Sequence, residues 1–146
     1  MDKQRILIIG MAISNNEIKR VKSLQQKKFR DESGLFLVEG EKGVNEAISA
    51  GVRIERIFVL EGLEGYPKDK VIETTEVVLS KISDAKSAPK VVAVAHQFEQ
   101  NIEIFEQFKR VILLEGIKDA GNLGTILRTA SAFGIDGIVL YGDTVD

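Results

Sequence analysis

Short apolar runs alternate along this chain with segments of helical periodicity, and this alternation constrains the fold more than any other feature. Strands are predicted over residues 33–40, 54–62, 75–80, 90–96, 109–116 and 136–142. Helices are predicted over residues 17–30, 41–51 and 122–133, where apolar side chains recur every three or four positions. Strands that alternate with helices form a parallel or mixed sheet covered by helices, so the sequence predicts an α/β fold.

Three of the predicted strands end in an apolar run followed by glutamate and glycine, at Gly40, Gly62 and Gly116. Their irregular spacing argues against a repeat protein and indicates a shared way of leaving a strand. A short helix or turn is expected over residues 81–88, and a partly helical connector over residues 97–107.

The residue types exclude several kinds of site. The 146 residues include no cysteine and one histidine, His96, so disulfides, thiolate zinc sites and imidazole metal clusters are not expected. The longest apolar run, ILIIGMAI, is too short to span a bilayer, so no membrane contact is expected and the cytoplasm is the expected location. His96 is expected to be a packing or surface residue and Tyr141 a core residue.

Basic side chains are concentrated in one segment of an acidic chain. The stretch EIKRVKSLQQKKFR holds six basic residues and one acidic residue. Ile18, Val21 and Leu24 recur at helical spacing, with Asn15 or Asn16 as the expected N-cap, so the stretch predicts an amphipathic helix with a basic face. Such a face either binds an anionic partner or is simply solvated, and composition alone favours the solvated face.

The loop DAGNLG leads from a predicted strand into the helix predicted over residues 122–133. Gly121 and Gly124 would bring free backbone N–H groups to the helix N-terminus, where an anion is favoured. A G-x-x-G sequence also occurs at any sharp turn, and the P-loop pattern is absent. A dinucleotide site stays open as an alternative, because Asp143 lies about twenty residues beyond the glycines, where a ribose-binding acid is expected.

One face of this helix is expected to be buried and the other to carry an arginine. On a helical wheel, Ile126, Ala130 and Phe133 form the predicted core stripe. Arg128 falls on the opposite side among small residues, where its guanidinium has room for a planar or phosphate-bearing partner. A surface arginine with a carboxylate neighbour is the alternative.

The stretch LLEGIKDAGNLGTILRTASAFGIDGIVL resembles the first signature motif of the SpoU/TrmH family, the S-adenosylmethionine-dependent RNA ribose 2'-O-methyltransferases of the SPOUT class. Upstream, ISNNEIKRVKSLQQKKFRDESGLFLVEG resembles the start of that family's substrate-binding domain. The resemblance implies that Asn122 and Arg128 are catalytic, with Arg128 at the place of the residue held to assist deprotonation of the ribose 2'-hydroxyl. A guanidinium is a poor base, so the chemistry of arginine favours another role for Arg128: contact with an RNA phosphate or stabilisation of the developing alkoxide.

The same resemblance implies two domains. Residues 1–106 would form an RNA substrate-binding domain, an α/β/α fold like certain ribosomal proteins, and residues 107–146 the β-α-β start of a SPOUT domain. The family's knot, which binds S-adenosylmethionine and forms the homodimer, would follow Asp146, so the SPOUT domain is expected to be incomplete and to lack its knot. No cofactor-binding residue is then expected in the chain, which should bind rRNA or tRNA without catalysing. A stand-alone RNA-binding module is the alternative.

The resemblance also implies which residues contact RNA. They lie in the basic segment and at the end of the following strand: Lys19, Arg20, Lys22, Lys27, Lys28, Arg30, Glu39 and Gly40. The sequence departs from the family pattern at Ala120, where the family often has proline, so a looser turn is expected there.

Overall fold

The structure, a computed structural model, describes residues 13–99 and 102–145. It forms two compact units, the first ending at Phe98 and the second beginning at Glu99. The expected domain boundary, between residues 106 and 107, therefore falls inside the second unit. The apolar run ILIIGMAI lies outside the described residues except for Ile13.

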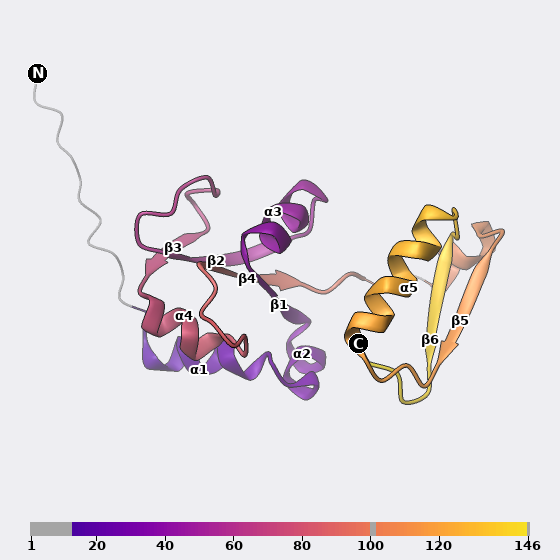
Figure 1. The fold of residues 1–146 in the computed structure, drawn as a ribbon, viewed down its shortest axis with the longest axis horizontal. Coiled ribbons are helices and arrows are strands. Elements are labelled where there is room, and N and C mark those ends of the chain that lie inside the picture. Colours follow the sequence, from indigo (N-terminus) through magenta and orange to yellow (C-terminus); the bar gives the residue numbers. More distant parts are fainter. Residues whose placement is uncertain (1–12, 100–101, 146) are drawn as a thin grey trace, which may run out of the picture. The chain divides into compact units, whose positions relative to one another are not determined.

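The first unit is a mixed four-stranded sheet with helices on both faces (Figure 1). In chain order its elements are α1 (Asn15–Ser23), α2 (Lys27–Ser33), β1 (Leu35–Glu39), α3 (Glu41–Ser49), β2 (Ile54–Leu60), β3 (Val71–Thr74), α4 (Glu76–Ile82) and β4 (Val91–His96). The strand order is β1-β4-β2-β3, with β2 and β3 parallel and the other neighbours antiparallel. The expected α/β class, with an α/β/α first unit, is confirmed.

Two apolar cores hold the helices on this sheet. One lies under α1 and α4 and includes Val21, Leu24, Phe58, Leu79 and Ile82. The other lies under α3 and contains Val44, and Figure 1 shows α3 on the opposite side of the sheet from α1 and α4. Strand β4 contributes to both cores, which is why its sequence, VVAVA before His96, reads as an unbroken apolar run.

Residues 75–80, predicted as a strand, belong to α4 and its N-cap. The Thr75 hydroxyl accepts a hydrogen bond from Val78 N at 3.4 Å. Leu79 and Ile82 are buried three positions apart, whereas Val77 is 62% exposed. The prediction was wrong because it weighed the β-propensity of two valines above the capping threonine and the helical spacing of the buried residues. The strand of this region is β3, which precedes Thr75 and was not predicted.

The N-terminus of α1 is capped by Ser14, one or two residues earlier than expected. The Ser14 hydroxyl accepts a hydrogen bond from Glu17 N at 3.1 Å. Ser14 therefore takes the role expected of Asn15 or Asn16, because a serine oxygen three residues before a free N–H meets the geometry of an N-cap.

The basic segment forms two helices where one was expected. The chain turns after Ser23 because Leu24, 3% exposed, enters the core under α1. Arg30 Nη1 holds this turn by donating to the carbonyls of Leu24 at 3.2 Å and Gln25 at 3.0 Å. The helical pattern of the sequence continues across the turn, so periodicity alone does not reveal it.

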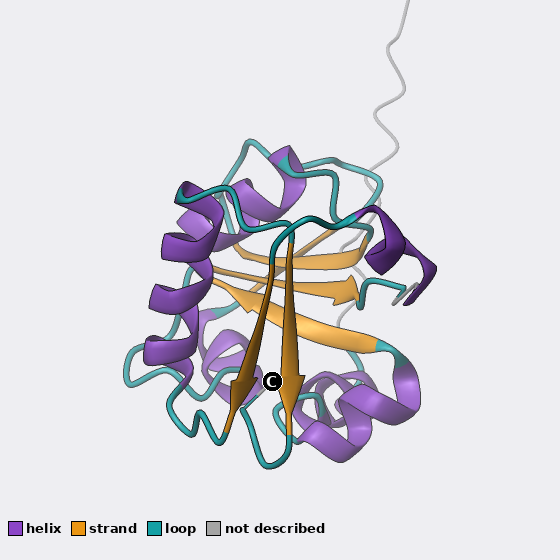
Figure 2. Ribbon diagram, turned by 90° about the vertical axis from the view of Figure 1, so that its right-hand side faces the viewer, coloured by secondary structure: helices purple, strands orange, loops and turns teal. Residues whose placement is uncertain are grey.

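The second unit contains a 3-10 helix η1 (Ile102–Gln107), β5 (Val111–Glu115), α5 (Ala120–Ala132) and β6 (Gly137–Tyr141). Strands β5 and β6 pair in parallel, with Ile112 opposite Ile138. Helix α5 lies to one side of this pair (Figure 2). The predicted β-α-β unit and the partly helical connector are confirmed.

The apolar-Glu-Gly signature has a common backbone cause. Gly40 follows β1 with φ 84° and Gly116 follows β5 with φ 69°. This left-handed region is open to glycine at little cost, so the strand ends where the glycine turns the chain.

The buried face of α5 differs from the predicted stripe. Leu123 and Ala130 are buried and Ile126 is half-buried, whereas Phe133 is 73% exposed. Phe133 is the C-cap residue and lines an open cavity together with Ile126 and Ala130, so it shares their face of the helix without being covered. Tyr141, expected in the core, is 60% exposed, because it lies on the same face of the strand pair as the exposed Leu113.

Candidate functional site

The entrance of α5 is built around a capping aspartate. Asp119 Oδ1 accepts a hydrogen bond from Asn122 N at 2.7 Å, and the Asp119 carbonyl accepts one from Leu123 N at 3.0 Å. The Asp119 carboxylate thus occupies one of the free N–H donors of the first turn, that of Asn122, and complements the helix dipole. This arrangement disfavours the dinucleotide alternative, which needs those N–H groups for a pyrophosphate.

Arg128 is exposed, and its guanidinium points back toward the start of α5. Nη2 donates to Thr125 Oγ1 at 3.3 Å, and Thr125 Oγ1 donates to the Gly121 carbonyl at 2.9 Å. Nη1 lies 3.4 Å from the position that a Cβ on Gly124 would take. Helical side chains lean toward the N-terminus, so Arg128 reaches over Gly124. No carboxylate pairs with Arg128 within residues 13–99 and 102–145, so the carboxylate-paired alternative is not found there.

Asn122 lies in the first turn of the same helix and is exposed. Its side-chain amide forms no hydrogen bond within the described part of the chain, and its backbone N–H is the one that Asp119 caps. The structure therefore places Asn122 and Arg128 on one helix, with Arg128 directed toward the turn that contains Asn122. Their side chains do not contact each other in the described structure.

A second loop, which follows β6, fixes the loop between β5 and α5. Lys118 Nζ forms an ion pair with the Asp143 carboxylate and donates to the Asp143 carbonyl at 2.6 Å. Gly116 N donates to Thr144 Oγ1 at 2.9 Å, and a further backbone bond joins Val145 N to the Ile117 carbonyl at 2.7 Å. These contacts lie at the carboxyl ends of two parallel strands, where open α/β sheets bind their ligands.

The hydrogen bond from Lys118, together with its positive charge, lowers the pKa of the Asp143 carboxyl below its ordinary value of 3.8. Asp143 therefore stabilises a loop instead of standing free for a ribose, as the dinucleotide alternative requires. The chemical capacity of this region rests with Arg128, whose guanidinium offers N–H donors to an anion or to a developing negative charge.

The basic residues predicted to bind RNA fall into two groups. In α2, Lys27 pairs with Asp31 at 3.7 Å and Lys28 with Glu32 at 3.9 Å, both at i, i+4 spacing. In α1, Lys19 and Lys22 are exposed and form no ion pair within the described residues. The positive charge of α2 is thus partly offset by its own acids, whereas that of α1 is not.

Glu39, Gly40 and Arg30 contribute to the structure of the first unit. Glu39 Oε1 accepts from Gln25 Nε2 at 3.1 Å, and its other oxygen accepts from the hydroxyl of the buried Ser83. Gly40 is the N-cap of α3, and its N–H donates to the Val91 carbonyl at 2.9 Å. Together with the contacts of Arg30, these bonds hold the turn between the two basic helices next to β1.

Two family models match the chain. The model described as MRM3-like substrate binding domain matches residues 15–93, and that of the SpoU rRNA Methylase family matches residues 109–146. The chain belongs to the SpoU/TrmH family.

Similar proteins of the SpoU/TrmH family include characterised enzymes and solved structures. The chain is 32% identical to the Bacillus subtilis 23S rRNA (guanosine(2553)-2'-O)-methyltransferase RlmP, over 90% of this chain and 54% of that protein. It is 31% identical to rRNA methyltransferase 3A, mitochondrial, of Danio rerio, over 90% of this chain and 34% of that protein. An AdoMet-bound rRNA methyltransferase from Sinorhizobium meliloti superposes with a TM-score of 0.73 at 33% identity, over 93% of this chain and 55% of that one. The chain spans about half the length of RlmP.

A cavity next to α5 does not suit S-adenosylmethionine, the cofactor of the SpoU/TrmH family. An open cavity of about 400 Å³ is lined by Ile112, Thr125, Ile126, Thr129, Ala130, Phe133 and Ile135. Thr125 and Thr129 are its hydroxyl-bearing residues, and both already donate to helix carbonyls at 2.9 Å. A sulfonium, an adenine and an amino-acid group need more polar partners than this cavity offers.

Sequence reasoning missed the residues that hold the candidate side chains in place. Thr125 and Asp119 were recognisable, because a hydroxyl at i−3 of an arginine and an aspartate before a helix are local signals. Gln25 and Ser83 were not, because their contacts with Glu39 join segments far apart in the sequence. Within the described residues no cluster of metal-binding side chains is found, and no described helix is long and apolar enough to span a membrane.

Proposed function

We propose that this chain takes part in S-adenosylmethionine-dependent 2'-O-methylation of ribose in rRNA or tRNA. Residues 1–106 would serve as the RNA substrate-binding domain, and residues 107–146 would supply the first part of the SPOUT methyltransferase domain. By themselves the 146 residues are expected to bind RNA without transferring a methyl group, and the poor fit of the cavity next to α5 to the methyl donor supports this expectation.

The observation that carries this proposal is the exposed guanidinium of Arg128, held over Gly124 and directed toward the turn of Asn122. A guanidinium stays protonated at any physiological pH, so it is a poor general base. It can instead hold an RNA phosphate or stabilise negative charge that develops on the ribose 2'-oxygen. Asn122, with its free amide, would help to orient the same ribose.

The RNA surface would run along the two basic helices. Lys19 and Lys22 are the stronger candidates for phosphate contacts, because no ion pair within the described residues competes for them. Lys27 and Lys28 would have to exchange their pairing with Asp31 and Glu32 for a phosphate. Arg30 and Glu39 would act by holding the turn between the helices, and Gly40 by beginning α3.

A cytoplasmic location and a homodimer belong to this proposal as well. Support for the location comes from the bacterial rRNA methyltransferases among the similar proteins, although one relative is named mitochondrial. The homodimer is expected of a full-length family member and rests on the family resemblance, so sedimentation equilibrium of a full-length member tests it.

Equilibrium binding of a fluorescein-labelled RNA hairpin over a range of salt concentrations tests the RNA assignment. Binding should be strongly salt-dependent, and each lost phosphate contact should lower the slope of log K against log salt by about one. We expect Lys19→Gln/Lys22→Gln to weaken binding more than Lys27→Gln/Lys28→Gln does. Failure of the chain to bind RNA at low salt contradicts the proposal.

A stand-alone RNA-binding module is the second candidate, favoured by the poor fit of the cavity to a cofactor. Arg128→Gln separates the two candidates. The methylation proposal expects Arg128→Gln to weaken binding of a hairpin with ribose 2'-hydroxyls more than binding of its 2'-deoxy counterpart. Unchanged affinity for both hairpins favours the module, whereas equal weakening indicates that Arg128 holds a phosphate, which both hairpins contain. Methyl transfer or stoichiometric uptake of labelled S-adenosylmethionine by the chain alone overturns the expectation that it does not catalyse.

A further inference from the structure

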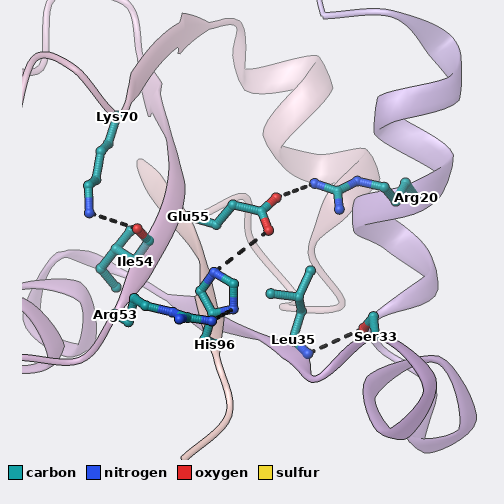
Figure 3. A network of polar contacts seen from close by, with 8 residues as sticks. All are labelled: Arg20, Ser33, Leu35, Arg53, Ile54, Glu55, Lys70 and His96. Atoms are coloured by element: carbon teal, nitrogen blue, oxygen red, sulfur yellow. Dashed lines mark hydrogen bonds and ion pairs between the residues drawn. The ribbon is translucent and has the colours of Figure 1, made fainter.

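A cluster of charged side chains lies where β2 begins and β4 ends (Figure 3). It consists of Arg20 from α1, Arg53 just before β2, Glu55 near the start of β2 and His96 at the end of β4; we call it the arginine cluster. We propose that the arginine cluster binds phosphates of the RNA substrate and extends the RNA surface from α1 across the end of the sheet. This inference rests on the proposed function; it adds Arg53 to the binding residues and Glu55 and His96 as residues that position the two arginines.

One chain of contacts orients both arginines. Arg53 Nη2 lies 2.7 Å from His96 Nδ1, and because arginine only donates, Nδ1 must accept. The ring proton is then at Nε2, which faces Glu55 Oε2 at 4.0 Å. The other carboxylate oxygen, Oε1, forms an ion pair with Arg20 Nη2. His96 and Glu55 therefore act as positioning residues for two guanidinium groups.

The cluster carries more positive than negative charge. Two guanidinium groups share one carboxylate, and the side chain of Arg20 is 49% exposed. Arg53 is exposed as well. Within the described residues each guanidinium uses one nitrogen in these contacts, so most of its N–H donors remain unused. A guanidinium fixed at one edge with free donors at the others suits the paired oxygens of a phosphate.

The cluster adjoins the basic residues of α1. Lys19 is the sequence neighbour of Arg20 and is exposed. Arg56, one residue beyond Glu55, is exposed and forms no ion pair within the described residues. An RNA strand that contacts Lys19 and Lys22 would therefore meet further cations at the end of the sheet.

The test measures binding of the labelled RNA hairpin to the whole chain by fluorescence anisotropy at several salt concentrations. We expect Arg53→Gln and Arg20→Gln each to weaken binding about threefold and to lower the salt slope by about one. Lys86→Gln is the matched control, because Lys86 is exposed and lies in the loop before β4, at the opposite end of that strand from His96. It should leave affinity and slope unchanged.

A second pair of variants tests the positioning of Arg53. His96→Phe removes the acceptor for Arg53 and is expected to weaken binding, whereas His96→Gln keeps a side-chain acceptor and is expected to restore it. Exposed ion pairs contribute little to stability, so urea unfolding should not change. If Arg53→Gln does not fold, Arg53→Lys takes its place, because it keeps the positive charge and loses the planar guanidinium. Arg53→Lys is expected to bind RNA more weakly, with an unchanged slope of log K against log salt.

The outcomes separate this inference from the proposed function. Normal RNA binding by Arg20→Gln and Arg53→Gln, together with weakened binding by Lys19→Gln/Lys22→Gln, overturns the arginine cluster and leaves the proposed function intact. Absence of RNA binding by the unaltered chain overturns the proposed function, and the inference with it.

Discussion

Arg128 and Gly124 are in contact across one turn of α5: Nη1 of the arginine lies 3.4 Å from the point that a Cβ at position 124 would occupy. A Cβ at this distance would be in ordinary van der Waals contact with the guanidinium, so the placement of Arg128 does not require glycine. Glycine within a helix is unfavourable, so this position lowers the stability of α5.

Gly124→Ala is expected to stabilise the fold by up to about 1 kcal/mol through helix propensity, and to leave the guanidinium in place, because the added Cβ would be in ordinary van der Waals contact with Nη1. Urea unfolding measures the first effect, and the NMR shift of Arg128 Nε measures the second. Gly121→Ala is the control, because its Cβ would lie 3.1 Å from Asp119 Oδ1 and would disturb the cap. An equal gain of stability in both variants contradicts the prediction.

Thr125→Val removes the hydroxyl that accepts from Arg128 Nη2 and donates to Gly121. Because the site is exposed, stability should change by less than about 0.5 kcal/mol, while the Arg128 side chain should become more mobile. Nitrogen-15 relaxation of Arg128 Nε measures this mobility. Thr125→Ser keeps the hydroxyl and should behave as the unaltered chain, and equal mobility in all three proteins contradicts the role of Thr125.

Glu39→Ala should destabilise the first unit by about 1–3 kcal/mol, because it leaves the buried Ser83 hydroxyl without its acceptor and removes one of the two acceptors of the Gln25 amide, the other being the Ile82 carbonyl. Chemical denaturation measures the loss. Glu39→Gln preserves the shape and one acceptor and should cost less. A loss of RNA affinity without any loss of stability would instead favour Glu39 as a direct RNA contact.

Thr75→Ala should destabilise the protein by about 1 kcal/mol, because it removes the N-cap of α4. Val77→Ala, at an exposed position two residues further on, should change stability by less than about 0.5 kcal/mol in either direction. If residues 75–80 formed a strand, Val77→Ala, which removes a β-branched side chain, would destabilise the protein more than Thr75→Ala. Thermal unfolding of the two variants distinguishes the helix from the strand.

The ion pair between Lys118 and Asp143 predicts a pH effect confined to acid. Because the folded pKa of Asp143 is lowered, the pair contributes fully above the ordinary carboxyl pKa of 3.8 and is lost as pH falls through the lower, folded value. A carbon-13 NMR titration of the Asp143 carboxyl measures that value. Lys118→Gln should return it toward 3.8, and an unchanged titration in this variant argues against the pairing.

The parts of the fold that followed from sequence are those with local causes. The apolar-Glu-Gly strand ends appear where Gly40 and Gly116 turn the chain, and the α5 region follows its strand as predicted. The errors have non-local causes. The turn after Ser23 depends on the burial of Leu24. Helix α4 depends on a core in which its Leu79 and Ile82 pack against residues from distant parts of the chain.

The candidate site divides in the same way. Asn122 and Arg128 were recognised from a contiguous motif, but the contact of Arg128 with Thr125 needed the helix geometry. The arginine cluster had no sequence signature, since its four residues come from three separate elements and their contacts depend on the register of β2 against β4. A basic segment can be read from composition, whereas which of its cations stay unpaired cannot.

The register of β2 against β4 shifts between Ile54 and Arg56, which pair with the adjacent residues Ala95 and Val94. Glu55 is the extra residue of this irregularity. Ile54 belongs with the core under α3, while Glu55 reaches Arg20 of α1 on the other side of the sheet. Loss of Glu55 would restore strict alternation and leave Ile54 opposite Ala95, on the face of the core under α3. A single-codon deletion of Glu55 should therefore keep both cores intact and remove only the acidic partner of Arg20, so this irregular residue serves the charged surface and not the packing of the sheet.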